Sequence, residues 1–328
     1  MAQGEIRIGT SGWNYPTGRG TWNGVFYPAR RPRGFDELGY YAERFDTVEV
    51  NSTFYRMPEA ATSEAWAART PPGFLFSVKL YQKFTHPDMY LASSRAADWD
   101  LSRSDVELFR IGVAPIAGAG KLAAILMQFP PSFHAEPDTR EYLDWLLDGL
   151  APFPLAVELR HRTWSDDAAS TQSVLDAHGA SWVLIDEPKF HDSIKQELAL
   201  GSGLLALDKS QDPSALREPS AESRGPFYVR LHGRNAATWW QQESAEDRYD
   251  YLYSAAELSP FANVARVASR TGRRVLMYLN NHFSAKSVAN AALLKHELGQ
   301  ELPGDYPGEI VGRYPELSGV VVTSGLPL

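Results

Sequence analysis

Eight short segments rich in aliphatic and β-branched residues recur along this chain of 328 residues, nearly all separated by helical or loop-plus-helix segments. Strands that alternate with helices indicate a parallel sheet, because parallel neighbours need a crossover connection. Eight such units with no break in composition predict an α/β fold, a TIM (β/α)₈ barrel of parallel strands with its site at their C-terminal face. The expected strands are residues 6–8, 47–50, 74–80, 122–128, 155–160, 182–185, 227–232 and 274–279.

An open, doubly wound sheet is the alternative architecture. Such sheets usually carry a glycine-rich nucleotide-binding loop, and neither GxGxxG nor GxxxxGK[ST] occurs in the sequence. The barrel is therefore favoured, as a single domain over residues 1–328. Within it we expect an aromatic loop at residues 9–32 over the barrel mouth, an irregular segment at 187–225 and a C-terminal tail at 300–328.

Composition narrows the functional classes. The chain has no cysteine, which excludes disulfides, thiolate nucleophiles and zinc or iron–sulfur sites bound by cysteine. Its formal net charge of −8 disfavours binding of a polyanion through bulk charge. Residues 1–5 do not begin a signal peptide, and no apolar run approaches the ~20 residues of a membrane helix. These features predict a cytoplasmic protein without a membrane partner.

The strand expected at residues 47–50 carries a carboxylate, Glu49, and is followed by Asn51. Alternate side chains of a strand point to opposite faces, so Glu49 and Asn51 share one face while Val48 and Val50 occupy the other. A buried carboxylate needs a partner or water. Glu49 is therefore either a charge paired inside the barrel or a residue of the site.

Other strands also end in polar residues, and in a barrel these ends converge on one face. Glutamate and histidine can transfer protons there, lysine can form an imine when its surroundings lower its pKa, and arginine can hold a carboxylate or phosphate. The candidate catalytic residues are Glu49, Glu158, His232, Lys79 and Asp186. The candidate ligand-binding residues are Trp13, Asn51, Tyr55, Gln128, Arg160, His161, Arg230, Asn280 and Asn281.

Arg230 has two interpretations. It either holds an anionic ligand or pairs with Glu49 or Glu158 in a buried network. On the first interpretation, Arg230→Met is expected to abolish anion binding without unfolding the protein. Trp239 and Trp240 follow the seventh strand. Four roles remain open for them: packing, a lid, a stacking platform or a surface that binds a partner.

Several of these segments together carry a family resemblance. The motifs are Gly9-Thr-Ser-Gly-Trp13, Val48-Glu-Val-Asn-Ser-Thr-Phe-Tyr55, Gln128-Phe-Pro-Pro-Ser-Phe133, Val157-Glu-Leu-Arg-His161 with Trp164, Val229-Arg-Leu-His-Gly233 and Asn280-Asn-His282. In this order, over about residues 6–299, the chain resembles the DUF72 (YecE-like) family. The resemblance implies a TIM barrel and no particular reaction. One departure is Ser284-Ala285, where the family pattern leads us to expect a glycine before the last helix.

Three functions follow from the candidate residues. The first is an enzyme, of the lyase, isomerase or hydrolase classes, that acts on a small carboxylated or phosphorylated ligand. Lys79, Arg160 and Arg230 would hold the anion, and Trp13 and Tyr55 would close the pocket. Glutamate and histidine would then supply the acid and base.

The second function is metal-dependent phosphodiester cleavage, by analogy with the endonuclease IV group of the same fold class. No cofactor is required by the sequence, which leaves a divalent metal open, and no residue is assigned as a metal ligand. Nucleic acid is the less favoured partner, because cations crowd the expected mouth and the chain is acidic. The third function is a non-catalytic accessory protein that binds a ligand in the same pocket.

Overall fold

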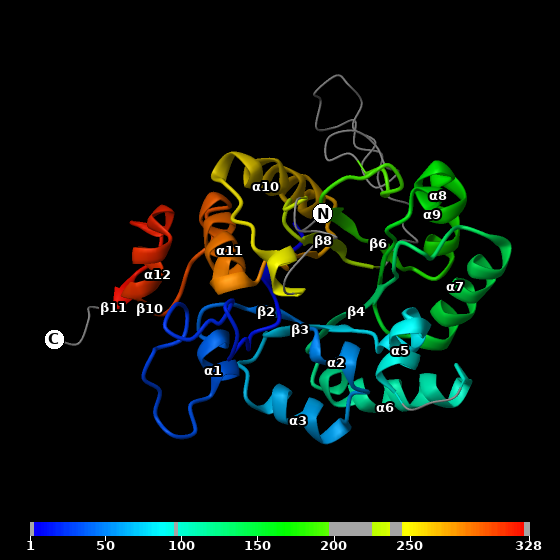
Figure 1. The fold of residues 1–328 in the computed structure, drawn as a ribbon, viewed down its shortest axis with the longest axis horizontal. Coiled ribbons are helices and arrows are strands. Elements are labelled where there is room, and N and C mark those ends of the chain that lie inside the picture. The colour runs from blue at the N-terminus through cyan, green and yellow to red at the C-terminus, as the bar shows by residue number, and fades with distance from the viewer. Residues whose placement is uncertain (1–2, 95–97, 197–224, 237–244, 325–328) are drawn as a thin grey trace.

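The central sheet consists of parallel strands that wrap into a barrel with helices around it (Figure 1). The computed structural model describes residues 3–94, 98–196, 225–236 and 245–324. The strand order is β6-β5-β4-β3-β2-β1-β9-β8-β7. The strands are β1 (Ile6–Ser11), β2 (Thr47–Val50), β3 (Leu75–Lys79), β4 (Leu122–Gln128), β5 (Leu155–Glu158), β6 (Ser181–Trp182), β7 (Leu184–Asp186), β8 (Phe227–Leu231) and β9 (Val275–Leu279).

The two end strands of this order are adjacent in sequence. Only Val183 separates β6 from β7, and its N–H donates to the carbonyl of Val157 at 2.9 Å. β6 pairs with β5, whereas β7 pairs with β8, so one short segment joins both ends of the sheet. The sheet therefore has eight strand positions with the sixth split in two, which confirms the predicted (β/α)₈ barrel.

The helices lie outside the strands (Figure 1). The long helices carry the expected signals, such as the capping box at α10, where Ser254 and Glu257 bond each other's backbone N–H groups. No described helix has the length and apolar character needed to cross a membrane. The helices are α1 (Glu37–Ala42), α2 (Ser52–Tyr55), α3 (Ala60–Ala68), α4 (Gln82–Thr85), α5 (Pro87–Ser93), α6 (Arg103–Gly118), α7 (Pro137–Leu150), α8 (Arg162–Asp166), α9 (Ala168–Ala177), α10 (Ala255–Arg270), α11 (Lys286–Glu297) and α12 (Gly308–Arg313).

The interior of the barrel is polar in its middle layer. Thr47 Oγ1 lies 2.6 Å from the hydroxyl of Tyr278, to which Ser77 Oγ donates at 3.0 Å. The next inward residue of β2 after Thr47 is Glu49, as strand alternation requires, and it is fully buried. The valines of the same strand are buried on the opposite face. Polar, hydrogen-bonding side chains therefore fill the barrel interior from its middle layer to its C-terminal face.

The loop after β1 is packed into the protein interior through its aromatic side chains. Trp22 and Phe26 are fully buried, and Trp22 Nε1 donates to the carbonyl of His282 at 2.7 Å. The C-terminal segment covers this loop from the side: β10 (Tyr306–Pro307) pairs with β11 (Thr323–Ser324), and the ring of Tyr306 lies 6.2 Å from that of Phe26. The later part of the loop is therefore anchored in the protein interior. Its earlier residues, 12–15, line the cavity at the barrel mouth.

Candidate functional site

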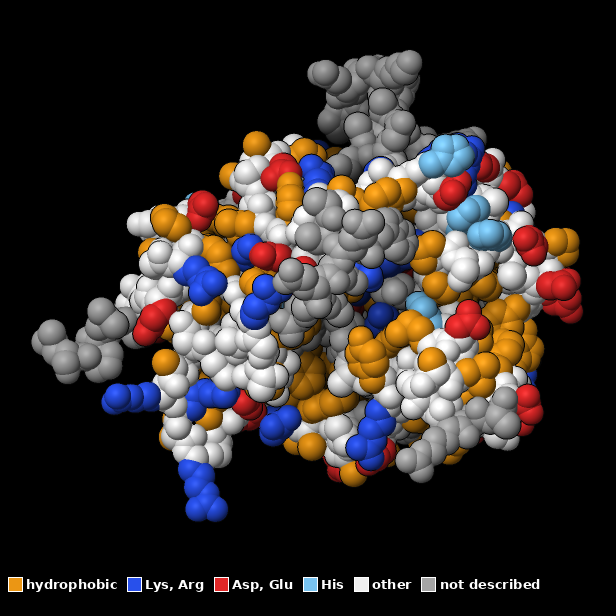
Figure 2. Space-filling view, in the orientation of Figure 1, with side chains coloured by type: hydrophobic (Ala, Val, Ile, Leu, Met, Phe, Trp, Pro, Cys, Tyr) orange, Lys and Arg blue, Asp and Glu red, His pale blue; other side chains and the backbone are white. Residues whose placement is uncertain are grey.

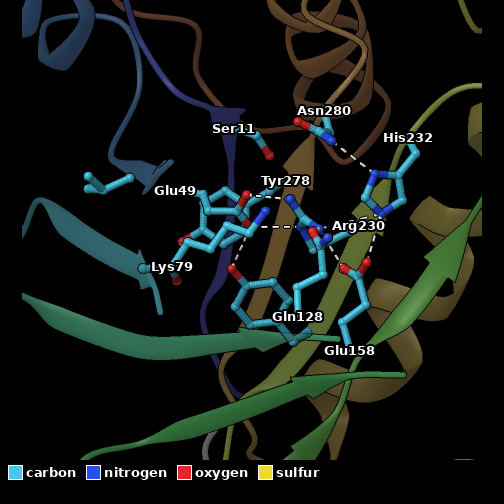
Figure 3. A network of polar contacts seen from close by, with 12 residues as sticks. Ser11, Glu49, Lys79, Gln128, Glu158, Arg230, His232, Tyr278 and Asn280 are labelled. Atoms are coloured by element: carbon cyan, nitrogen blue, oxygen red, sulfur yellow. Dashed lines mark hydrogen bonds and ion pairs between the residues drawn. The ribbon is translucent and has the colours of Figure 1, made fainter. Parts of the chain in front are cut away.

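Arg230, on β8, is the centre of a buried ion network (Figure 3). Its Nη2 and Nε donate to the two carboxylate oxygens of Glu49 at 2.7 and 2.9 Å. Its Nη1 donates to Glu158 Oε2 at 2.5 Å and to Gln128 Oε1 at 2.8 Å. The hydroxyl of Tyr228 donates to Glu49 Oε2 at 2.8 Å. Arg230, Glu49 and Glu158, each at most 1% exposed, are therefore satisfied by one another.

This pairing corrects the expectation for Arg230→Met. Two buried carboxylates share the charge of Arg230, so its removal leaves them without their main counter-ion. Burial opposes the charge of Glu158, but Arg230, Arg160 and His232 outweigh burial and hold its pKa well below the usual range. Glu158 is thus a fixed carboxylate at neutral pH. Loss of Arg230 is expected to destabilise the fold and not only to weaken ligand binding.

His232 lies at the edge of the same network. Its Nδ1 is 2.9 Å from Asn280 Nδ2, and its Nε2 is 3.4 Å from Glu158 Oε1. Burial, reinforced by Arg230 and Arg160 and opposed by Glu158, lowers the pKa of His232 to about 3. The imidazole is therefore neutral near pH 7, and its Nε2 also lies 3.3 Å from Arg160 Nη2.

Arg160 joins a third carboxylate to the network. Its Nε donates to Glu158 Oε1 at 2.7 Å, and its Nη1 lies 3.6 Å from Glu187 Oε2. Burial raises the pKa of Glu187, although Arg160 opposes the shift. Both arginines of the barrel mouth are thus committed to protein carboxylates.

A cavity of about 290 Å³ lies at the barrel mouth next to this network. Figure 2 shows Lys and Arg side chains in the hollow at the centre of this face. Two larger hollows, of about 1240 and 480 Å³, contain none of the predicted site residues. The smaller cavity is lined by Gly12, Trp13, Asn14, Tyr15, Asn51, Ser52, Tyr55, Lys79, Gln128, Arg230, Tyr249, Asn280 and His282.

Lys79 is the last residue of β3 and differs from both arginines. Its Nζ lies 4.0 Å from the centroid of the Phe54 ring, and within the described ranges no carboxylate forms a salt bridge with it. Burial and the charges of Arg230 and Arg160 lower the pKa of Lys79 to about 7, although Glu158 and Glu49 act in the opposite direction. Near neutral pH the amine is therefore divided between its charged and neutral forms.

The predicted site residues fall into three groups. Those on the cavity wall are Trp13, Asn51, Tyr55, Lys79, Gln128, Arg230 and Asn280. Those in the adjoining ion network, off the cavity wall, are Glu49, Glu158, Arg160 and His232. Those bound elsewhere are Asp186, His161 and Asn281.

Asp186 and Asn281 make structural contacts beside the cavity. Asp186 accepts from Arg234 Nε at 2.8 Å and from the hydroxyl of Tyr253 at 2.7 Å. Asn281 donates from Nδ2 to Asn290 Oδ1 at 2.8 Å, which fixes the turn after β9 to α11. These side chains hold the connections that follow β7 and β9, and neither lines the cavity.

His161 precedes α8 and accepts a hydrogen bond from the backbone N–H of Thr163, as a cap of that helix. Its ring stacks on that of His134 with the centroids 3.9 Å apart. Among the described residues, no group of three or more histidine, aspartate or glutamate side chains is placed to hold a metal ion. The metal-dependent alternative therefore gains no ligand set from the described part of the barrel.

Sequence reasoning missed three aromatic residues of the cavity wall as site residues. The ring of Tyr15 stacks on that of His282 at 4.2 Å, and the ring of Tyr249 lies 4.8 Å from His282. The signals for two of them were present, since Tyr15 lies in the aromatic loop and His282 follows the predicted Asn280-Asn281 pair. Tyr249 ends a 3₁₀ helix (Ala245–Tyr249) and no pattern marked it. Trp239 and Trp240 lie outside the described residues.

The turn before α11 contains Ser284 and Ala285, where the family pattern led us to expect a glycine. Both residues adopt the left-handed backbone conformation, with φ of 52° and 63°. Glycine favours this region because it has no Cβ. The backbone is therefore the one a glycine would prefer, although two other residues occupy it.

Comparisons with known proteins agree with this architecture. The model of the family described as "Protein of unknown function DUF72" matches residues 7–309. UPF0759 protein YunF of Bacillus subtilis (strain 168) is 25% identical over 311 residues, which cover 93% of this chain and 99% of that protein.

Two solved structures are also similar. A DUF72 family protein from Thermotoga maritima is 28% identical, with a TM-score of 0.70 over 90% of this chain and 100% of that chain. One from Enterococcus faecalis is 20% identical, with a TM-score of 0.70 over 92% of this chain and 99% of that chain, and it supports the fold alone. With its barrel, its motifs and the family match over nearly all its length, this chain belongs to the DUF72 family.

Proposed function

We propose that this protein is an enzyme that binds a small organic anion, carboxylated or phosphorylated, in the cavity at the C-terminal face of the barrel. The observation that carries the proposal is Lys79, a cation on the cavity wall with no salt bridge to a described carboxylate. A buried cation that has no anionic partner in the protein favours the binding of an anionic ligand.

The charges beside the cavity favour an anion. Arg230 and Arg160 pair with the carboxylates of Glu49 and Glu158, and burial disfavours the charge of Glu187, the third carboxylate of the network. The protonated amine of Lys79 therefore has no carboxylate bound to it among the described residues. At short range in a partly buried site, an opposite charge interacts more strongly than it does in water. A bound anion is therefore expected to raise the pKa of Lys79 and to draw a proton from solution.

The remaining walls suit a small ligand with a carbon skeleton. Side-chain amides of Asn51, Gln128 and Asn280 offer donors and acceptors, and Trp13 and Tyr55 offer aromatic surface. Asn51 Oδ1 is buried and finds no hydrogen-bond partner among the described residues. A cavity of about 290 Å³ matches the lower end of small-molecule pockets, which are ~300–1,000 Å³.

The enzymatic part of the proposal rests on the same amine. General acids and bases work best when their pKa is near the working pH, and the pKa of Lys79 is lowered to about 7. Glu158 and His232 are held in the charged and the neutral state respectively near pH 7, so neither changes its protonation readily there. We therefore assign proton transfer to the amine of Lys79, whereas the carboxylates of Glu49 and Glu158 pair with the arginines.

Thermal shift measurements test the anion site. Carboxylates, inorganic phosphate and sugar phosphates are expected to raise the melting temperature of the wild type, because they bind the folded state. Lys79→Met should lose most of this shift. Lys83→Met should keep it, because Lys83 does not line the cavity and its Nζ forms a salt bridge with Asp105 at 2.7 Å. An equal shift in Lys79→Met, or a shift that requires Mn²⁺ or single-stranded DNA, would contradict the proposal.

A further inference from the structure

We infer that Lys79 Nζ is a nucleophile that forms an imine with a small aldehyde or ketone carrying a carboxylate or phosphate group. The inference rests on the proposed anion site, because the anionic group would bring the carbonyl carbon to the amine. Nothing in the family description assigns such chemistry.

The position of Lys79 supports a defined nucleophile. Thr53 Oγ1, in α2, donates to the carbonyl of Lys79 at 2.6 Å and lies 3.1 Å from the carbonyl of Val50. These bonds tie the end of β3 to the end of β2. The Phe54 ring, in contact with Nζ at 4.0 Å, fixes the other end of the side chain. The amine is therefore held at the cavity wall by packing and not by a salt bridge that would occupy its lone pair or keep it charged.

The electrostatic surroundings supply the neutral amine that attack on a carbonyl requires. The pKa of Lys79 is lowered to about 7 by burial and by two neighbouring arginines, a combination that activates lysine nucleophiles. Lys83 is a useful contrast, because its Nζ forms a salt bridge with Asp105 at 2.7 Å and its side chain does not line the cavity. Lys79 thus combines access to the cavity with a substantial neutral fraction.

The step balances within the cavity. The lone pair of Nζ attacks the carbonyl carbon, the C–N bond forms, and the carbonyl electron pair moves to oxygen. One proton then passes from the nitrogen to this oxygen to give a neutral carbinolamine, and a second proton taken up by the hydroxyl group allows it to leave as water. Loss of water then leaves an iminium, so that a neutral amine, a carbonyl and one proton give an iminium and water. Tyr55 and Tyr249 line the same cavity, and we assign the passage of these protons to their hydroxyl groups.

The iminium retains the unit positive charge of the ammonium group. The anionic group of the substrate therefore keeps its counter-charge through the step. An iminium also withdraws electrons from the adjacent carbon and so weakens its C–H and C–C bonds. This points to 2-oxo acids or phosphorylated sugars as the substrate class, and to proton transfer or carbon–carbon cleavage beside the carbonyl as the reaction.

Reductive trapping tests the inference on the full-length protein. Pyruvate and dihydroxyacetone phosphate, each with sodium borohydride near neutral pH, should give one reduced adduct per chain, because hydride converts the imine to a stable secondary amine. Peptide mapping by mass spectrometry should place the adduct on Lys79. The yield should saturate with probe concentration and increase as the pH rises through about 7.

Two matched variants separate the inference from the anion site. Lys79→Arg keeps the positive charge but has no amine for an imine, so it should retain the thermal shift with phosphate and lose the adduct. Lys83→Arg should retain both. An adduct in Lys79→Arg, adducts spread evenly over surface lysines, or no adduct from either probe while anions still bind would overturn the imine and leave the anion site standing. Loss of the anion-induced shift in the wild type would overturn both.

Discussion

Arg230 and Lys79 are two cations of one barrel mouth with opposite surroundings. Arg230 meets two carboxylates and an amide within hydrogen-bond distance, whereas Lys79 meets an aromatic ring and has no salt bridge with the described residues (Figure 3). The difference separates two uses of buried charge. The charge of Arg230 is needed by the fold, because its partners depend on it. The charge of Lys79 has no carboxylate partner among the described residues, and on our proposal only a bound anion compensates it.

The largest effect that tests this comparison is expected for Arg230→Met. The substitution leaves the buried carboxylates of Glu49 and Glu158 without their main partner, and breaking such a pair costs about 3–5 kcal/mol. Urea unfolding should show a loss of this size in the free energy of unfolding. Adding Glu49→Gln and Glu158→Gln to the same chain should restore part of it. An unchanged unfolding free energy would assign Arg230 to the ligand instead.

Lys79→Met should have the opposite sign. Replacing a buried, unpaired amine by an apolar side chain of similar length is expected to stabilise the unliganded protein by about 1 kcal/mol or more, while abolishing anion binding. Unfolding and binding measured on the same preparations check the two effects together. If Lys79→Met is destabilised as strongly as Arg230→Met, the two cations play the same role and the comparison fails.

The pH dependence of stability sharpens the contrast. The pKa of Lys79 is about 7 in the folded protein and 10.5 for an ordinary lysine, so between these values the unfolded chain binds more protons. The stability of the wild type relative to Lys79→Met should therefore rise as the pH increases from about 7 to 10.5 and be constant below that window. Melting temperatures of both proteins over this range, without ligand, provide the measurement. A flat difference would mean that the amine is charged in the folded state throughout.

Ala285→Gly provides an uncharged reference with the smallest effect. Ala285 is fully buried in a left-handed turn, and glycine relieves a cost of roughly 1–2 kcal/mol while losing some chain entropy, so a net gain below about 1 kcal/mol is expected. The same change at Ala289, within α11, should instead destabilise the protein by about 1 kcal/mol. Neither effect should vary with pH, unlike that of Lys79→Met. Destabilisation by Ala285→Gly would show that the methyl group contributes more packing than the turn costs.

Strand periodicity was sufficient to predict part of the polar cluster at the ends of the strands. Glu49 follows Thr47 by two residues and Glu158 ends β5, so both were expected to lie at the barrel mouth, and both do. The bounds of β2 and β4 were predicted to the residue, because β-branched or aliphatic runs end there at a polar residue. This part of the fold is local, which is why a single sequence contains it.

The pairing of Arg230 with Glu49 and Glu158 was one of the two interpretations that the sequence left open, and strand periodicity could not decide between them. Arg230 is far in sequence from Glu49 and Glu158, and only the curvature of the barrel decides that it lies between them and that Lys79 does not reach either closely. Tyr249 reaches the cavity from a connection without a strong pattern. Asp186 looked like a site residue at a strand end, yet Arg234, beyond the next strand, holds it. Such contacts depend on loop geometry, on which hydrophobic periodicity carries no information.

The polar middle layer of the barrel has a consequence for anyone who would move this site to another protein. Beneath Glu49 lies the hydroxyl of Tyr228, whose ring is 5.2 Å from that of Tyr278, which in turn is hydrogen-bonded to Thr47. A barrel with the usual aliphatic interior could accommodate the residues of the mouth, but it would lack the hydroxyl groups that hydrogen-bond to Glu49 and Thr47. The residues of the mouth would therefore have to be transferred together with the tyrosine and threonine side chains of the layer below them.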